Sequence, residues 1–426
     1  MTWTNHPRNF HTVDIAKEEH VRFITTIAQH TNVINLLYQS PLHRIGGFAV
    51  VQDLKLPNLD FYNWTSSLNL CSSLKSNNVR YLNVEDTCLD QVNMSQSFSR
   101  LSMVDPELIL TNNMFQNYPL HLNFIRAGLV DSLGNVYSGS LLIVPFGCNQ
   151  RLPFSPETHW KIYAENAIEQ EVFVMSQYHN SDPLEFMIDG LPRIVPYLKF
   201  LWENPTIKLH VLDRETSYSG RLTLDMLAVL GINKSRVVTG HVKSEVIYLP
   251  QGGGCCSPFA LNIQLLSKIF HQHIQQSNGF NNPRRNVVLL LDSADNYRLH
   301  QFDNILQQAK DATSNFDLEV QVLHDDLDYP LNVLMDLFYR AVIVVGSKAP
   351  LMSNILFCQP GTVVMEVLCA SPELTMGHLQ VAYGLGLRYH AIPGLSGCMS
   401  GILVDVFHVK DALEYYVSRY KEIIDE

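Results

Sequence analysis

The sequence predicts an α/β protein built from two open parallel sheets, each covered by helices, that face a common cleft. Strand-like and helix-like segments alternate along the chain twice, from about residue 170 and again from residue 286, and a stretch rich in Gly, Pro and Asn separates the two runs. The chain of 426 residues is also too long for one ordinary hydrophobic core.

We expect three parts. Residues 1–165 form a mixed N-terminal extension with a β-hairpin that packs on the first domain. Residues 166–265 form the first parallel-sheet domain, and residues 266–426 form the second, which ends in a helix. In open α/β sheets the ligand cleft lies at the carboxyl ends of the strands, so the residues that follow each strand are the candidates for function.

Composition excludes several classes of protein. The net charge of −11 argues against a nucleic-acid binder, because neutralising phosphates requires a basic surface. No apolar run reaches the roughly 18 residues of a membrane span, and the N-terminus lacks the apolar core of a signal peptide. The eight cysteines include no Cys-x-x-Cys pair, so a zinc site is not expected.

In the first half, we expect an early helix over residues 17–38 and a hairpin over 120–147 that turns at 133–135. The segment 182–204 has helical spacing, with Asp182 as N-cap and Pro183 at the first helical position. A second helix closes near Gly231. Strands are expected at 171–176, 207–212, 235–240 and 245–250.

In the second half, the same reasoning predicts strands at 286–293, 318–324, 342–346, 362–368 and 388–394. Helices are expected between them and at the end of the chain, at 299–312, 330–341, 352–359, 375–386 and 409–424.

The segment "AVIVVGSKAPLMSNILF" (341–357) is the first candidate for function. A buried strand ends in small residues, Gly346 and Ser347, and is followed by a single cation, Lys348. Ser353 and Asn354 then precede apolar helical residues, so the backbone N–H groups after Asn354 and the charge of Lys348 could hold a phosphate group. The alternative is a tight turn whose lysine points into water. The spacing of a Walker phosphate loop is absent.

Two more charged residues follow strands in this half. Glu366 lies near the end of an otherwise apolar strand, where a carboxylate could accept hydrogen bonds from a ribose diol, or form a salt bridge or face solvent instead. Arg298 follows another strand and could clamp a diphosphate with two hydrogen bonds, although an exposed loop arginine fits the same pattern.

In the first half, Glu185, Asp189 and Arg193 recur at intervals of four on one expected helix and would form one charged stripe. A carboxylate on a helix that faces the cleft can act as general base, and an exposed face stabilised by ion pairs is the alternative. His179, just upstream, is a weaker candidate for the cleft.

Two conspicuous motifs are interpreted as structural. "GGGCC" (252–256) lacks a cation and a clear strand–turn–helix context, so we interpret it as a flexible turn between domains. Asp326 and Asp328 form an Asp-x-Asp pair of the kind that holds Mg²⁺ or Mn²⁺ in some sugar-nucleotide enzymes. Their position between a strand and a helix favours a helix-entry turn with capping acids.

Together these motifs resemble glycosyltransferase family 61, which includes plant β-1,2-xylosyltransferases and animal O-linked N-acetylglucosaminyltransferases. The family motif runs Gly-x-His-Gly-Ala-x-Leu-Ser/Thr-Asn-x-x-Phe and then Pro-Gly-Thr-x-Val-x-Glu. The residues that match it in register are Gly346, Ser353, Asn354, Phe357, Pro360, Gly361, Thr362 and Glu366. Lys348 stands where the family has histidine, and Ala349 and Pro350 replace its Gly-Ala pair.

The resemblance extends over about residues 120–410. Upstream, Leu191, Pro192 and Arg193 match the end of a family helix that usually carries a histidine. Glu185 stands at that histidine's position and Asp189 at a family acid. A cation and a carboxylate are chemically competent substitutes for the two histidines, which favours an active, diverged enzyme.

The resemblance implies the GT-B fold of two Rossmann-type domains and an inverting, metal-independent transfer from a nucleotide sugar. Xylose, N-acetylglucosamine or a similar sugar would pass from a UDP donor to a hydroxyl of a glycan or glycoprotein. Asp189, or Glu185 as second choice, would act as base, and Arg193 and His179 would line the acceptor side.

The donor would bind through Gly346, Ser347, Lys348, Ser353, Asn354, Glu366 and Arg298, with no cofactor. Two other functions are kept open: a non-catalytic binder of nucleotide sugars or glycans, and a metal-dependent transferase that uses Asp326 and Asp328.

Family members usually work in the secretory lumen. Because this chain starts with methionine and shows no anchor, we expect a soluble cytoplasmic enzyme, microbial or virus-encoded. The secretory lumen is the alternative that the family suggests.

Overall fold

The structure is a computed structural model. It describes residues 11–14, 48–50, 82–83, 121–138, 141–144, 167–176, 186–212, 217–250, 260–277, 284–294, 297–368, 377–395 and 401–425. The chain divides into two compact units, one formed by Met1–Asp60 with Gln116–Pro258 and the other by Phe61–Phe115 with Phe259–Glu426. The helix expected at 17–38 lies outside the described residues.

The first unit contains a mixed sheet in the order β1-β6-β5-β4-β10-β7-β8-β9, and β2 pairs with β4. One half, β10-β7-β8-β9, is parallel, and β4 joins it antiparallel to β10. The strands are β1 (His11–Asp14), β2 (Phe48–Val50), β4 (His121–Val130), β5 (Val136–Ser138), β6 (Leu141–Val144), β7 (Ala167–Val174), β8 (Lys208–His210), β9 (Val237–Val238) and β10 (Val242–Pro250).

The predicted hairpin is present and turns where expected. The Asp131 carboxylate accepts hydrogen bonds from the backbone N–H groups of Leu133 and Asn135, each at 2.9 Å, and Gly134 adopts a positive φ of +85°. A Cβ on Gly134 would lie 2.3 Å from the carbonyl oxygen of Ser176. Glycine is therefore required both by the turn and by the close approach of the strand end at Ser176.

The prediction of one regular helix over residues 182–204 is wrong. Within the described part, Phe186–Gly190 (η2) forms a π-helical turn, Leu191–Arg193 (η3) and Val195–Tyr197 (η4) are 3₁₀ turns, and only α8 (Leu198–Glu203) is α-helical. Pro192 and Pro196 cause the interruption, because each lacks the N–H that continues an α-helical ladder. The next helix, α9 (Tyr218–Val229), ends as predicted before Gly231, whose φ is +77°.

The second unit contains a sheet in the order β12-β11-β13-β14-β15-β3, parallel except for the last pair. Its strands are β3 (Leu82–Asn83), β11 (Val287–Asp292), β12 (Glu319–His324), β13 (Ala341–Ser347), β14 (Val363–Leu368) and β15 (Arg388–Pro393). Its helices are α10 (Ala260–Ser277), α11 (Phe302–Thr313), α12 (Leu331–Arg340), the 3₁₀ helix η7 (Pro350–Phe357), α13 (Gly377–Leu385), α14 (Val406–Ser418) and α15 (Tyr420–Asp425).

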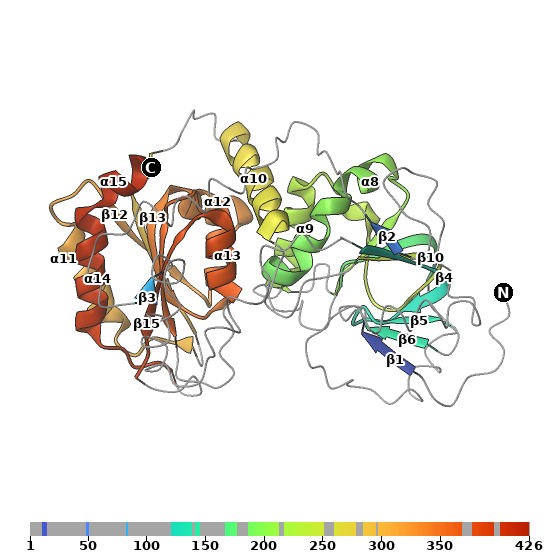
Figure 1. The fold of residues 1–426 in the computed structure, drawn as a ribbon, viewed down its shortest axis with the longest axis horizontal. Coiled ribbons are helices and arrows are strands. Elements are labelled where there is room, and N and C mark those ends of the chain that lie inside the picture. The colour runs from blue at the N-terminus through green and yellow to red at the C-terminus, as the bar shows by residue number, and fades with distance from the viewer. Residues whose placement is uncertain are drawn as a thin grey trace. The chain divides into compact units, whose positions relative to one another are not determined.

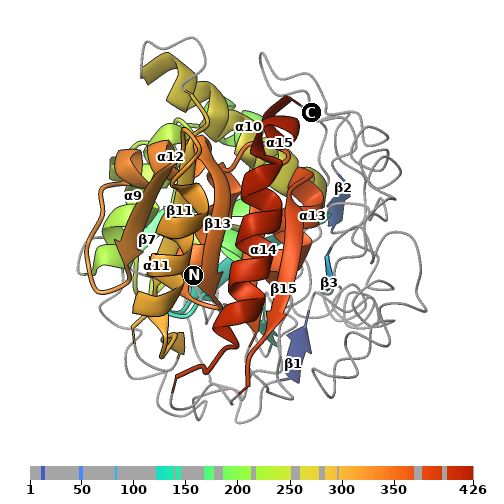
Figure 2. The same ribbon diagram turned by 90° about the vertical axis from the view of Figure 1, so that its left-hand side faces the viewer.

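Helices cover both faces of this second sheet. In Figure 1, α11 and α14 lie on one face and α12 and α13 on the other, and Figure 2 looks onto the α11–α14 layer. The helix α10 and η7 pack with α12 and α13. The predicted α/β class, with two sheets rich in parallel strands, is thus confirmed. The predicted helix over 409–424 is divided by Arg419 into α14 and α15.

Two fully buried histidines are held neutral by their surroundings. The Nε2–H of His210 donates to the carbonyl of Gly240 at 2.6 Å, so its Nδ1 accepts from the Ser176 hydroxyl at 2.5 Å. Burial lowers the pKa of His210 to about 4 and that of His390 to about 3. None of the described helices is both long and apolar enough to cross a bilayer.

The turn at Gly134 gives a stability prediction. Replacing Gly134 with alanine combines a disfavoured positive φ with a clash, so the free energy of unfolding should fall by about 2–4 kcal/mol. Gly240→Ala is the matched control, because Gly240 has a similar φ of +76° and no atom within 4 Å of its Cβ position. Urea denaturation measures the free energy of unfolding of both variants. If both lose the same amount relative to wild type, the close-packing argument is wrong.

The buried histidines predict a loss of stability in acid. His210 takes up a proton near pH 6.5 when unfolded but only near pH 4 when folded, so its contribution is complete above pH 6.5 and declines between pH 6.5 and 4. His210→Gln removes this titration. The slope of unfolding free energy against pH should then be lower by up to about 1.4 kcal/mol per pH unit between pH 6 and 4.5. Urea denaturation at several pH values measures the slope, and an unchanged slope would count against the assignment.

Candidate active site

The strand order of the second unit marks where a ligand would bind. The strand that follows β11 in sequence, β12, lies on one side of it, and β13, β14 and β15 follow one another on the other side. The direction in which strands are added therefore reverses between β11 and β13. Ligands of open α/β sheets bind at the carboxyl ends of the strands beside such a reversal. Ser293 follows β11 there, and Lys348 follows β13.

Ser347 ties the two strands together at this point. Its Oγ donates to the carbonyl of Tyr297 at 2.5 Å and lies 3.0 Å from the Ser293 Oγ, which can donate to it. Both serines are buried. These bonds use the Ser347 hydroxyl within the fold, and its contact with a donor stays a prediction.

Gly346 lies under the helix that follows it. A Cβ at this position would be 2.9 Å from the Leu291 Cβ and 3.0 Å from the Met352 Cε. The side chains of neighbouring helix and strand therefore occupy the space that any larger residue would need. The absence of a side chain lets η7 pack directly on β13.

Two cationic residues flank the reversal. Lys348 is half-buried and has no ion-pair partner among the residues that the structure describes. Arg298 is exposed in the connection from β11 to α11, where its carbonyl accepts a 2.7 Å hydrogen bond from the Ile402 N–H. Their positive charges are thus available at this edge, and their roles toward a ligand stay predictions.

The helix after Lys348 begins earlier than predicted. η7 is a 3₁₀ helix that starts at Pro350, so the N–H groups after Asn354 lie inside it and not at its N-terminus. Pro350 has no N–H, and the Met352 N–H bonds to the Ala349 carbonyl at 2.9 Å. The expectation that N–H groups after Asn354 bind phosphate is therefore wrong, which leaves Lys348 as the main charge of this loop.

The Glu366 carboxylate is buried and already has two partners. Its Oε2 accepts a hydrogen bond from the Tyr389 hydroxyl, and its Oε1 lies 2.7 Å from the His378 Nδ1 at the start of α13. Burial and the Glu366 charge raise the pKa of Tyr389 well above its usual value, so Tyr389 remains a donor. Direct contact between Glu366 and a ribose stays a prediction.

In the first unit, Asp189 and Arg193 are buried and not part of an exposed stripe. Their exposed fractions are 5% and 3%. The Arg193 Nη2 donates to the Pro250 carbonyl at 2.5 Å, while its Nε and Nη1 have no partner among the described residues. Burial lowers the pKa of Arg193 to about 10, against the opposing effect of Tyr197 and Asp189, so the guanidinium stays charged near neutral pH.

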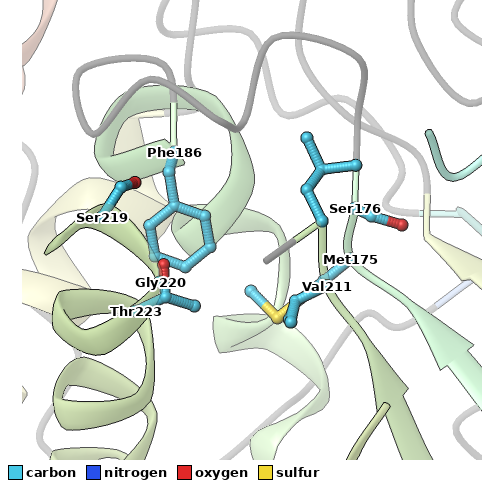
Figure 3. A pocket seen from close by; sticks show the side chains of 8 residues that line it. Met175, Ser176, Phe186, Val211, Ser219, Gly220 and Thr223 are labelled. Atoms are coloured by element: carbon cyan, nitrogen blue, oxygen red, sulfur yellow. The ribbon is translucent and has the colours of Figure 1, made fainter. Parts of the chain in front are cut away.

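A small open hollow lies beside this segment. Figure 3 shows Phe186, Ser219 and Thr223 on one side and Met175 and Val211 on the other. Phe186 belongs to η2, three residues before Asp189, and Met175 and Val211 follow the carboxyl ends of β7 and β8. The hollow therefore occupies the ligand edge of the first sheet.

The remaining sequence candidates divide into two groups. Glu185, His179 and the 252–256 turn lie outside the described residues. Asp326 and Asp328 are exposed in the turn between β12 and α12, but Pro330 is the N-cap of α12, so the expected capping role of these acids is wrong. Among the described residues, no three His, Cys, Asp or Glu side chains cluster as a metal site would need.

A protein-family model matches the middle of the chain. The model of the family described as Glycosyltransferase 61 matches residues 184–365, which include Asp189, Lys348 and the first half of β14. Residues 184–365 carry a glycosyltransferase family 61 domain. The family domain indicates a glycosyltransferase.

Other comparisons add little to the glycosyltransferase assignment. No curated protein matches the chain. Among solved structures, a diflavin flavoprotein A3 from Nostoc sp. has 11% identity and a TM-score of 0.24, and the match covers 33% of this chain and 96% of that one.

Sequence reasoning missed the two partners of Glu366 in this glycosyltransferase. A carboxylate on a buried strand requires a partner, and His378 at the start of the next helix was a visible candidate. Tyr389 lies on the neighbouring strand, and its link to Glu366 depends on the register of β14 with β15. That register was not readable from the sequence.

Proposed function

We propose that this protein is an inverting, metal-independent glycosyltransferase of the GT-B type that moves a sugar, such as xylose or N-acetylglucosamine, from a UDP-sugar to a hydroxyl of a glycan or glycoprotein. The single observation that carries the proposal is the match to the glycosyltransferase 61 family over the segments that hold both the buried acid of the first unit and the cationic loop of the second.

The second unit would hold the donor at the reversal between β11 and β13. There, Lys348 has no acidic partner in the described part of the chain, and a diphosphate would supply one. As the bond from C1 of the sugar to the diphosphate oxygen breaks, negative charge grows on that oxygen. Lys348 would stabilise this charge, with Arg298 as the second cation.

The first unit would supply the base. Asp189 would take the proton of the acceptor hydroxyl while the hydroxyl oxygen attacks C1 from the side opposite the leaving nucleoside diphosphate, which inverts the anomeric centre. Asp189 lies on a π-helical turn, a rare geometry that occurs often at functional sites. The adjacent guanidinium of Arg193 favours the ionised form of the carboxylate.

Two other functions are outcomes of the same tests. Lys348 and Glu185 replace the two family histidines, and this loss is the argument for a non-catalytic binder. Such a protein would bind the donor without turnover. A metal-dependent transferase would use Asp326 and Asp328 and would lose activity in EDTA. Release of nucleoside diphosphate from a panel of sugar nucleotides, with and without EDTA, separates the three.

The cationic loop predicts a loss of donor binding. Lys348→Ala should weaken the binding of UDP by roughly tenfold or more, because a cation next to a diphosphate is removed. Lys310→Ala is the control, because Lys310 is exposed on α11. Titration calorimetry in buffer with EDTA measures both affinities. Equal affinities for wild type and Lys348→Ala would refute the loop assignment.

The buried acid predicts a loss of turnover. Asp189→Asn should lower kcat by about 10²–10⁴-fold and leave donor affinity nearly unchanged, because only the proton acceptor is lost. Asp225→Asn, on the exposed side of α9, is the matched control. A thermal melt verifies that the variant is folded. If the folded variant transfers sugar as fast as wild type, the base lies elsewhere.

A further inference from the structure

Several buried polar atoms of the second unit have no hydrogen-bond partner among the described residues, and we consider three of them that lie on neighbouring elements. They are the Ser353 Oγ, the Asn354 Oδ1 and the His378 Nε2, and their side chains are 1%, 2% and 3% exposed. A buried polar atom without a partner costs roughly 1–3 kcal/mol, so native proteins leave few of them. A bound ligand or an ordered water at these atoms would supply the missing bonds.

The three residues gather on one face of the sheet, at its ligand edge. Gly346 and Glu366 are opposite each other in the register of β13 and β14, so they lie on the same face. η7, which carries Ser353 and Asn354, packs over Gly346 through Met352. His378 bonds to Glu366, and its helix α13 packs against η7.

Each of the three atoms can accept a hydrogen bond. The Glu366 carboxylate accepts from the Nδ1–H of His378, and in this Nδ1–H tautomer the Nε2 is an acceptor. The Asn354 amide nitrogen donates to the Leu351 carbonyl at 2.8 Å, which leaves its Oδ1 as an acceptor. A serine hydroxyl can both donate and accept. Three possible acceptors in one place favour a group that carries O–H donors over a phosphate oxygen.

We propose that His378 contacts the donor directly and accepts a hydrogen bond from one of its hydroxyl groups, with Asn354 and Ser353 completing a hydroxyl-binding site. Glu366 is then a positioning residue: it fixes the tautomer and the ring orientation of His378, and Tyr389 fixes Glu366. The inference rests on the proposed function, since it names the residues that bind the hydroxyl groups of the nucleotide sugar. It separates this hydroxyl site from the cations Lys348 and Arg298, which face the diphosphate.

Two variants of His378 distinguish contact with the ligand from a structural role. In His378→Asn, the amide reaches the position of Nδ1 and keeps the bond to Glu366, but nothing occupies the position of Nε2. In His378→Gln, the amide oxygen reaches the position of Nε2. We expect His378→Asn to bind the donor roughly tenfold more weakly than wild type and His378→Gln to retain most of the affinity. A purely structural role predicts the reverse order, in both affinity and melting temperature.

The source of the hydroxyl is determined with analogues in titration calorimetry. The affinities of UDP, GDP and ADP are compared first, and they identify the nucleotide base that the protein prefers. The 2′-deoxy and 3′-deoxy forms of the nucleotide that binds most tightly then each lack one ribose hydroxyl. If His378 contacts the ribose, wild type should bind one of the deoxy forms roughly tenfold more weakly than the parent nucleotide. The His378→Asn variant should then bind this deoxy form with the same affinity as wild type does. If His378 contacts the transferred sugar, the His378→Asn substitution weakens binding of the UDP-sugar but not of UDP.

Each remaining outcome has a distinct meaning. If His378→Asn binds all of these probes as wild type does, an ordered water alone fills the site and the inference is overturned. If wild type binds no nucleoside diphosphate and no sugar nucleotide, the proposed function fails and takes this inference with it. Lys348→Ala, which should weaken every diphosphate equally, provides the control for the separate phosphate site.

Discussion

The ligand edge of the second unit depends on one constraint, the burial of the Glu366 carboxylate inside a parallel sheet. A buried carboxylate is tolerated only when its oxygens are bonded, and here they bind one residue from the neighbouring strand and one from the following helix. The charge therefore fixes where α13 begins relative to β14 and β15. Removing either partner would leave one buried carboxylate oxygen without its hydrogen-bond donor, so the three residues act as a set.

Around this set, the edge divides into a rigid part and an adaptable part. The Ser347 hydroxyl, bonded to the connection that follows β11, fixes the end of β13, and Gly346 lets η7 rest directly on that strand. Lys348 follows this fixed point with a long and flexible side chain. A family histidine at this position would be a shorter, planar group able to exchange protons, whereas lysine keeps its charge at physiological pH. The loop is thus suited to hold charge and not to transfer protons.

Much of the second unit was predictable from sequence, because buried parallel strands are continuous apolar runs that end in small or polar residues. The run from Ala341 to Val345 and the turn after Ser347 are examples. The site was less predictable. The contacts of Glu366 depend on strand register, and the burial of Asp189 and Arg193 depends on tertiary packing, whereas their spacing alone suggests an exposed stripe. The error in 182–204 had a visible cause, because Pro192 and Pro196 stand in the sequence while the apolar spacing favours a helix.

Those two prolines have a further consequence for the segment that carries Asp189. A proline restricts its own φ and the conformation of the residue before it, in the unfolded chain as well as in the folded one. The unfolded segment therefore has fewer conformations to lose, and the irregular turns form with a smaller loss of entropy than their geometry suggests. Irregular backbone and conformational order are compatible here, and a buried acid can be held firmly without a regular helix.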